Sequence, residues 1–260
     1  MMIAETLAPE KEAPATATRS RLTVILPVWN EATAIVRSIE AVVAFSRTHP
    51  EYDFTFVDDG SDDGTAAILR ERLSVAADGN LNLIAHSTHR GKGLAVRSAL
   101  ASCDAECVCF IDGDLAYSLD QLILLESALE SADIVIGNRF LDRSSASHLP
   151  PVRQALSQCF NRLVRSVLHL PHSDTQAGFK GFRAPVARHL FGLQRIDGLG
   201  FDAELLFLAR KFGYNVAEMP VQVGPEHRYK TSSQELLRNS LLMLIDVLGV
   251  RWNDLAARYR

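Results

Sequence analysis

Few features of this chain point to a secreted, disulfide-linked or zinc-binding protein. Its 260 residues contain four cysteines, whose spacing fits neither a zinc site nor a disulfide framework: Cys103, Cys107, Cys109 and Cys159. We therefore expect these cysteines to serve as small apolar side chains in a reducing compartment.

Long apolar runs are also lacking. The longest, 241–250, contains Asp246 and is too short to cross a bilayer. Residues 1–20 lack the apolar core of a signal peptide, and their Ala, Pro, Thr and Glu content predicts a disordered tail ahead of a single domain at 21–260. The expected location is therefore the cytoplasm, including the cytoplasmic face of a membrane.

Positive charge is not in excess. The formal net charge is −4, and the sequence has no basic stripe of the kind that binds nucleic acid. The basic loop 89–93 (HRGKG) has the glycine spacing of neither a Walker loop nor a dinucleotide-binding loop. An anionic ligand would therefore need local basic residues or a metal ion.

What the chain does contain is an alternation of strand and helix patterns. Hydrophobic residues make up 47% of it, which is ample for a globular core. Short apolar runs predict strands at 22–26, 54–57, 81–85, 107–111, 134–136, 179–183 and 216–223. Apolar residues at helical spacing predict helices between them. This order predicts an α/β fold, with a mostly parallel sheet flanked by helices on both faces.

Polar clusters follow three of the predicted strands. They are 27–31 (PVWNE), 58–61 (DDGS) and 112–114 (DGD). Open parallel sheets bind ligands in the crevice at the carboxyl ends of their strands. The sequence therefore predicts one ligand site built from these three clusters.

Asp112 and Asp114 are the candidate metal ligands. Alternate residues of an extended segment point the same way, so both carboxylates can address one hard divalent cation. Such a cation, Mg²⁺ or Mn²⁺, would neutralise a diphosphate leaving group. Gly113 leaves the backbone open to a ligand. The alternative is a pair of solvated loop acids.

The second cluster and the basic loop have nucleotide-binding interpretations. Asp58 and Asp59 could accept hydrogen bonds from a nucleobase or a ribose, although Ser61 could simply cap the following helix. Lys92 lies at the start of a predicted helix, where backbone N–H groups attract phosphate.

Other charged residues are candidates for anion binding or proton transfer. A carboxylate at the start of the 201–212 helix, Asp202 or Glu204, could be a general base, or could only favour the positive end of the helix. Arginine side chains match phosphate oxygens well, and the candidate anion contacts are Arg139, Arg153, Arg228 and Lys230.

Seven motifs occur in the order found in inverting family-two glycosyltransferases. The chain resembles these enzymes, especially the dolichyl- or polyprenyl-phosphate glucosyltransferases and mannose synthases. The match runs from about Leu22 to Ser233 and comprises VILPVWNE (24–31), VDDGSDDGT (57–65), RGKGLAVR (90–97), DGDL (112–115), GNR (137–139), DTQAGFKGFR (174–183) and GFDAELLFLA (200–209).

The resemblance implies a GT-A fold, with a Rossmann-like sheet, and a metal-dependent transfer that inverts the anomeric carbon. By matching positions, it implies metal binding by Asp112 and Asp114 and a place near the donor for Arg139. The candidate catalytic residues are then Asp114, Arg139 and Asp202. The implied donor contacts are Pro27, Trp29, Glu31, Val57, Asp59, Lys92, Asp112, Gly113, Asp114, Arg139, Arg228 and Lys230. Arg153, Ser157 and Asn161 would lie near the acceptor or the donor phosphate, and the candidate acceptor contacts are Arg153, Ser157, Asp174 and Gln176.

The resemblance also implies the partners. The donor would be UDP-glucose or GDP-mannose, and the acceptor a polyprenyl or dolichyl phosphate. A soluble transferase with a hydroxyl acceptor and Asp202 as base is the alternative, and a nucleotide-sugar binding protein without activity is a third. Ala116 stands where some mannose synthases have a metal-binding glutamine, and the loop 224–233 matches the family only loosely.

The segment 236–250 is amphipathic. Its apolar side chains share one face, which could rest on a membrane or pack into the core. Core packing is the expectation.

Overall fold

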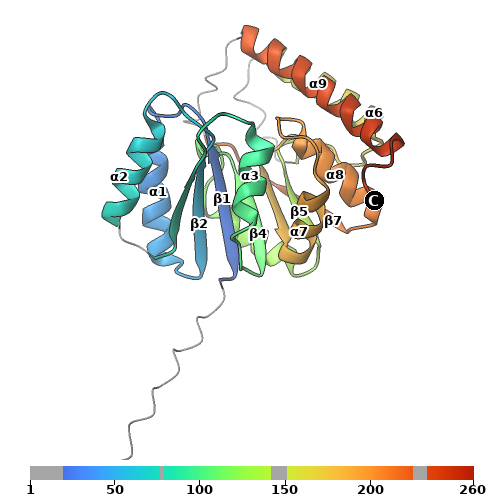
Figure 1. The fold of residues 1–260 in the computed structure, drawn as a ribbon. Helices are drawn as coiled ribbons and strands as arrows, with labels where there is room; N and C mark the ends of the chain where they lie inside the picture. Colours follow the sequence, from blue (N-terminus) through green and yellow to red (C-terminus); the bar gives the residue numbers. More distant parts are fainter. Residues whose placement is uncertain (1–19, 77–78, 142–150, 225–232) are drawn as a thin grey trace, which may run out of the picture.

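The computed structural model describes residues 20–76, 79–141, 151–224 and 233–260 (Figure 1). The predicted tail therefore lies almost wholly outside the described residues. The strands are β1 (Leu22–Val28), β2 (Tyr52–Asp58), β3 (Leu81–Ala85), β4 (Cys107–Ile111), β5 (Ile134–Asn138), β6 (Phe179–Arg183) and β7 (Val216–Pro220). Each predicted strand is present within a few residues of its expected bounds.

Helices connect most consecutive strands, as the sequence pattern predicts. They are α1 (Ile35–Thr48), α2 (Thr65–Ala76), α3 (Lys92–Leu100), α4 (Gln121–Leu129), α6 (Pro151–Leu168), α7 (Ala184–Leu193), α8 (Phe201–Phe212) and α9 (Ser233–Leu255). Helix α7 is absent from the predicted elements. Pro185 occupies its first turn, where proline favours helix initiation, and its buried residues recur at helical spacing, so a signal for this helix was present.

The strands form one seven-stranded sheet in the order β3-β2-β1-β4-β6-β5-β7. Only β6 runs antiparallel to its neighbours, β4 and β5. The chain moves outward from β1 to β2 and β3, and then returns to place β4 on the other side of β1. This reversal makes the carboxyl ends of β1 and β4 the switch point at which an open sheet binds ligands.

A hydrophobic core covers each face of the sheet. Helices α1, α2 and α4 pack on one face, and α3, α7 and α8 pack on the other. Phe110 and Phe201 pack together in the second core, with ring centroids 5.3 Å apart. The expected α/β architecture with helices on both faces is therefore confirmed.

The expectation that the last helix packs its apolar face into the core is wrong. Helix α9 buries Val247 and Val250 and lies against α6 (Figure 1), but it exposes another row of apolar side chains. Leu241 is 59% exposed, Ile245 58% and Trp252 65%. The sheet is already covered, so only one edge of this broadly apolar helix finds a partner. No helix in the described ranges has the length and apolarity needed to span a bilayer.

Two turn glycines should respond differently to the same substitution. Gly60 has φ +70°, and a Cβ there would lie 2.3 Å from the carbonyl carbon of Thr88. Gly64 has φ +95° with open space around it. We expect Gly64→Ala to cost about 1 kcal/mol through backbone strain, and Gly60→Ala about 2 kcal/mol more through the clash with backbone. Urea unfolding measures both, and equal losses would contradict the clash.

Candidate active site

The loops that follow β1 and β2 are joined by hydrogen bonds. The Asn30 N–H donates to Ser61 Oγ at 2.9 Å, and Asn30 Oδ1 accepts the Asp62 N–H at 3.0 Å. The Glu31 N–H donates to Thr65 Oγ1 at 2.9 Å. Asn30 has φ 54°, a left-handed conformation that asparagine tolerates better than most residues. These contacts fix one wall of the crevice.

Asp59 connects β2 to the basic loop. Its carboxylate accepts the backbone N–H of Arg90 at 3.1 Å and that of Gly91 at 2.7 Å, while His86 and His89 also contact it. Asp59 is only 2% exposed. Asp59, which the resemblance implies as a contact of the sugar donor, is therefore already hydrogen-bonded by protein N–H groups. These contacts indicate that Asp59 holds the loop that starts α3.

The neighbouring carboxylate, Asp58, has one buried oxygen without a hydrogen-bond donor. Its Oδ2 accepts the Ser61 N–H, but no donor among the described residues reaches Oδ1. A buried acceptor without a donor is costly, so a ligand N–H or O–H at this position would be stabilising. Asp58 is thus better placed than Asp59 to receive a nucleoside, which the shared motif did not distinguish.

The remaining predicted nucleoside contacts differ in accessibility. Trp29 is 49% exposed and stacks on His89, with ring centroids 4.2 Å apart. Pro27 and Glu31 are half-buried beside it. The side chain of Val57, in β2, is fully buried in the core, so it can support the site by packing but has no exposed surface for a ligand.

Asp112 and Asp114 directly follow β4, beside the end of β1. Lys92 Nζ donates to Asp112 Oδ1 at 2.6 Å, and Asp114 Oδ1 accepts the Ala116 N–H at 3.2 Å. Burial disfavours the charged amine of Lys92, but the carboxylates of Asp112 and Asp202 outweigh this effect and raise its pKa. Lys92 therefore supplies the positive charge that the acidic motif requires.

Two glycines let the acidic motif pack closely. A Cβ on Gly178 would lie 2.0 Å from Asp112 Oδ2, and a Cβ on Gly113 would lie 2.3 Å from Val28 Cγ1. The backbone at Leu115 has φ 51°, an uncommon conformation for leucine. Within the described residues no three His, Cys, Asp or Glu side chains gather as metal ligands. The pair still fits Mg²⁺ or Mn²⁺, because such ions commonly complete their coordination with water and substrate phosphates.

Arg139 and Asp174 form a forked ion pair. Arg139 Nε donates to Asp174 Oδ2 at 2.8 Å, and Nη2 donates to Oδ1 at 2.9 Å. Burial would raise the pKa of the fully buried Asp174, but the charge and hydrogen bonds of Arg139 reverse this and lower it. The Gln176 N–H also donates to Asp174. Asp174 therefore orients Arg139, whereas the sequence predicts it as an acceptor contact.

Asp202 and Glu204 have protein partners at the start of α8. Buried Lys180 donates to Asp202 Oδ1 at 2.5 Å and to the Ala177 carbonyl. Glu204 accepts the N–H groups of Arg195 and Ile196. The sequence patterns did not indicate Lys180 as a partner, because it lies 22 residues before Asp202.

Helix α6 carries the predicted acceptor contacts Arg153 and Ser157 in its first turns, where side chains lie outside the described residues. Arg228 and Lys230 also lie outside them.

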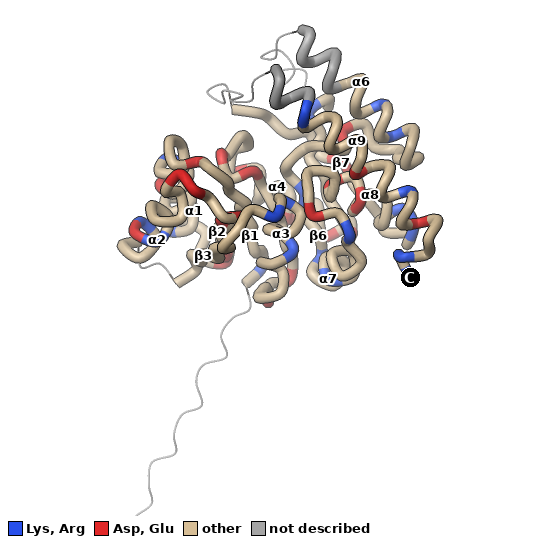
Figure 2. The backbone as a smooth tube through the Cα atoms, turned by 45° about the horizontal axis from the view of Figure 1, so that its top comes forward, with Lys and Arg blue, Asp and Glu red and all other residues tan. Residues whose placement is uncertain are grey.

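Basic residues lie along α6 (Figure 2). Asn161, further along the same helix, donates to the Ser173 carbonyl at 2.7 Å and accepts from Thr175 Oγ1 at 2.7 Å. The helix is thus fastened to the loop that carries Asp174.

Solved structures share this architecture. Glucosyl-3-phosphoglycerate synthase from Mycobacterium tuberculosis, in complex with UDP, matches with a TM-score of 0.65 and 20% identity, covering 89% of this chain and 80% of that one. Mannosyltransferase PcManGT from Pyrobaculum calidifontis, with GDP-Man and Mn²⁺, matches with a TM-score of 0.59 and 18% identity, covering 93% and 67%. The fold is therefore the GT-A fold.

The profile of Glycosyl transferase family 2 matches residues 23–191, and the chain belongs to this family. A dolichyl-phosphate beta-glucosyltransferase of Trichomonas vaginalis is 30% identical over 77% of this chain and 63% of its own length. That of Dictyostelium discoideum is 26% identical over 90% of this chain and 75% of its own. The chain thus spans a little under two thirds of the first relative. The predicted family and enzyme class are confirmed.

Replacing Asp174 by asparagine should destabilise the protein. The amide places an N–H group against the Arg139 fork and leaves that cation unpaired, at a cost of about 2–4 kcal/mol near neutral pH. Because the pKa of Asp174 is lowered on folding, its contribution is complete above the ordinary aspartate pKa and is lost as the pH falls below about 4.

Urea unfolding between pH 3 and 7 measures this difference. The control is Asp62→Asn, at an exposed position that should change little. A gap between wild type and Asp174→Asn that grew on acidification would contradict the assigned ion pair.

Proposed function

We propose that this protein transfers glucose or mannose from a nucleotide-diphosphate sugar to a polyprenyl or dolichyl phosphate, inverting the anomeric carbon. The observation that carries the proposal is the meeting of the three polar clusters at the switch point between β1 and β4. Glucose is favoured by the relatives named dolichyl-phosphate beta-glucosyltransferase, and UDP by the solved glucosyl-3-phosphoglycerate synthase in complex with UDP. The mannosyltransferase with GDP-Man keeps mannose as the alternative.

The donor nucleoside would lie over the ends of β1 and β2. The unpaired oxygen of Asp58 supplies a hydrogen-bond acceptor, and Trp29 supplies a stacking surface. Pro27 and Glu31 line the same edge. Asp59 would not contact the nucleoside directly. It would fix the Arg90–Gly91 backbone by hydrogen bonds and thereby position the first turn of α3.

The diphosphate would lie beside Asp112, Asp114 and Lys92. These two carboxylates would hold Mg²⁺ or Mn²⁺, which supplies charge neutralisation for the departing nucleotide diphosphate when bound. Lys92, released from Asp112, would contact the diphosphate oxygens. This part of the site therefore needs positioned charges more than a proton donor.

An acceptor phosphate is already ionised at neutral pH and needs no general base. The first candidate for a general base, Asp202, is 4% exposed and paired with Lys180. The ion pair with Lys180 already occupies this carboxylate, so the contacts of Asp202 favour a phosphate acceptor over a hydroxyl acceptor. Arg139, fixed by Asp174, would stabilise the charge around the reacting atoms.

The exposed row on α9 would let the chain rest on a membrane that contains the lipid acceptor. Leu241, Ile245, Leu248 and Trp252 recur at helical spacing and are each more than half exposed. An amphipathic helix of this kind inserts its apolar face at the lipid headgroup boundary. The protein would then act as a peripheral enzyme at the cytoplasmic face.

Removing the acidic motif should abolish transfer. We expect Asp112→Asn and Asp114→Asn each to lower metal-dependent kcat/KM by about 100-fold or more, because a positioned charge on the leaving group is lost. The assay uses UDP-glucose and GDP-mannose, with Mg²⁺ or Mn²⁺, with and without a short polyprenyl phosphate.

Glu130→Gln, the same charge change at the exposed residue that follows α4, is the control. Unchanged transfer by Asp112→Asn would refute the metal role. Transfer by the wild-type chain to hydroxyl acceptors but to no phosphate would move the assignment to a soluble transferase.

Polar substitutions on α9 should weaken membrane binding. We expect Leu241→Ser with Ile245→Ser to lower affinity for anionic lipid vesicles at least ~10-fold, since each buried aliphatic side chain contributes about 2 kcal/mol. Vesicle sedimentation measures this. Val75→Ser, at a site that is 79% exposed on α2, should bind like wild type. Equal binding by all three proteins would rule out α9 as the contact.

A further inference from the structure

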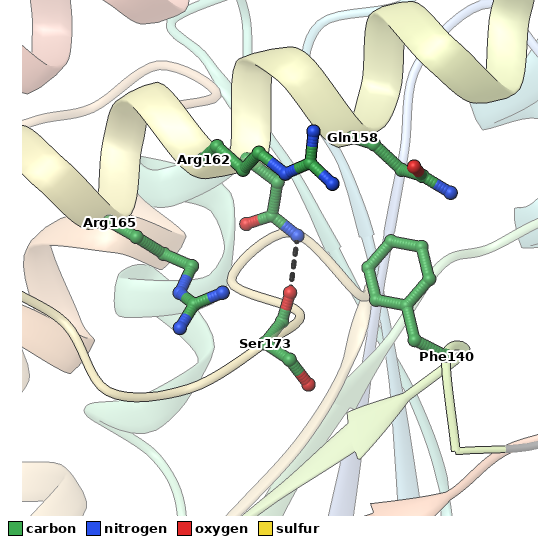
Figure 3. A pocket seen from close by; sticks show the side chains of 6 residues that line it. Phe140, Gln158, Arg162, Arg165 and Ser173 are labelled. Atoms are coloured by element: carbon green, nitrogen blue, oxygen red, sulfur yellow. Dashed lines mark hydrogen bonds between the residues drawn. The ribbon is translucent and has the colours of Figure 1, made fainter.

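A pocket of about 230 Å³ beside α6 belongs to the site already described. Arg162, Arg165 and Ser173 are among the side chains that line it (Figure 3). Ser173 directly precedes Asp174, which is bonded to Arg139. This pocket therefore extends the side of the crevice on which the proposed mechanism places the acceptor.

A larger recess lies at the other end of the strands. Its volume is about 360 Å³, and it is formed by the amino-terminal parts of β1, β2 and β3 together with the residues around the end of α3. Helix α3 packs across β1 and β2 and ends at Leu100, next to the recess (Figure 1). The polar part of the lining consists of Thr23, Asp53, Thr55, Asn82, Ser102 and Asp104.

Two nearly buried threonines face this recess from the sheet. Thr23 is 5% exposed and Thr55 is 7% exposed, and Asp53 lies beside Thr23 in the register and two residues before Thr55. In the described part of the chain, neither threonine hydroxyl has a hydrogen-bond partner. Hydroxyl groups at this depth are normally hydrogen-bonded. Both are therefore available to a molecule in the recess.

The recess is also negatively charged. Asp53 accepts a hydrogen bond from the Ser20 hydroxyl, and no Lys or Arg side chain of the described ranges forms an ion pair with it. The exposed residue Asp104 adds a second carboxylate to the lining. The carboxyl end of α3 contributes a partial negative charge of its own. These three sources of negative charge attract a cation.

The neighbouring polar groups leave hydrogen-bond acceptors facing the recess. Ser102 Oγ donates to the Ala99 carbonyl at 3.1 Å, so its lone pairs remain able to accept. Arg188 of α7 reaches the same loop, but it donates to the Cys103 carbonyl at 3.1 Å and is not among the lining residues. The group that fits is therefore a cation that carries hydrogen-bond donors.

The size and the apolar part of the recess indicate an organic cation. Pockets that bind small molecules measure about 300–1,000 Å³, and the volume of about 360 Å³ falls in this range. Leu83, Ile84 and Ala99 contribute apolar surface next to the polar groups. An ammonium group on a short hydrocarbon stem matches both parts, because the stem packs on apolar side chains while the charged end meets polar ones.

We propose that this recess is a binding site for a small aliphatic amine in its protonated form. The ammonium group donates hydrogen bonds to Asp53, Thr23 and Thr55, and the hydrocarbon stem packs on Leu83 and Ile84. A lysine side chain carries the same chemical group, and the test separates the two sources. The recess and the acidic motif lie at opposite ends of the strands, so this binding does not depend on the proposed function.

The test is a proton NMR titration of the full chain near neutral pH, where an alkylamine is protonated. The probe is butylamine. Butanol has the same stem without the charge, and tetramethylammonium has the charge without an N–H donor. Nα-acetyl-lysine amide presents the lysine side chain.

The variants remove one contact at a time. Asp53→Asn and Asp104→Asn each remove a charge, while Thr55→Val removes a hydroxyl and keeps the β-branched shape. Thr55→Ser restores the hydroxyl. Asp62→Asn, the same charge change at an exposed position near the carboxyl ends of the strands, is the matched control. Urea unfolding shows whether each variant is folded, and Asp104→Asn, at an exposed position, keeps the charge test available if Asp53→Asn does not fold.

We expect wild type to bind butylamine at least ~10-fold more tightly than butanol or tetramethylammonium. Asp53→Asn should weaken butylamine binding ~10-fold or more, and Thr55→Val about 3-fold or more, because each loses a hydrogen bond to a charged group. Thr55→Ser and Asp62→Asn should bind like wild type.

Two results would overturn the site. One is butylamine binding no tighter than that of butanol or tetramethylammonium, and the other is an equal affinity for butylamine in wild type, Asp104→Asn and Thr55→Val. Binding of Nα-acetyl-lysine amide as tightly as butylamine would support the site and extend it to a lysine side chain of another protein. Binding of butylamine alone would support the site and restrict it to small amines.

Discussion

The position of β4 beside β1 is the constraint on which the site depends. Because the strand order reverses there, the loops after both strands must leave the sheet side by side without crossing. The acidic motif after β4 then lies against the last two residues of β1, Pro27 and Val28, so closely that Gly113 has no room for a side chain. Hydrogen bonds between the loops of β1 and β2 extend this surface toward β3. The strand order therefore brings the loops after β1, β2 and β4 together around one crevice.

Charge compensation organises the interior of that crevice. Asp112 is paired with Lys92, Asp174 with Arg139, and Asp202 with Lys180. A buried charge without a partner is costly, so these pairs explain how several acids can lie near one another in an α/β domain. The three pairs also differ in exposure. The pairs of Asp174 and Asp202 are largely buried, whereas Asp112 remains accessible to a ligand and to a cation.

How much of this was predictable depended on the distance in sequence over which each contact forms. The strands, the three polar clusters and the family were evident from local patterns, and Lys92 and Arg139 were already candidates. The use of Asp59 to hold the Arg90–Gly91 backbone was not evident, because its partners lie 31 and 32 residues away. Adjacent Asp58 has the same chemistry and differs only in which donors surround it. The exposed row on α9 also escaped prediction, because an apolar helical face has the same pattern whether or not a partner covers it.

The sequence by itself determined the strands, the helices other than α7, the α/β class and the residue types at the strand ends, because periodicity and short-range propensity act within a few residues. Only the tertiary structure decided which acids are paired, which oxygen of Asp58 is left without a donor, and that Arg162 and Arg165 share a pocket with Ser173. Those outcomes depend on burial and on contacts between distant segments. Such contacts exist only once the sheet has brought those segments together.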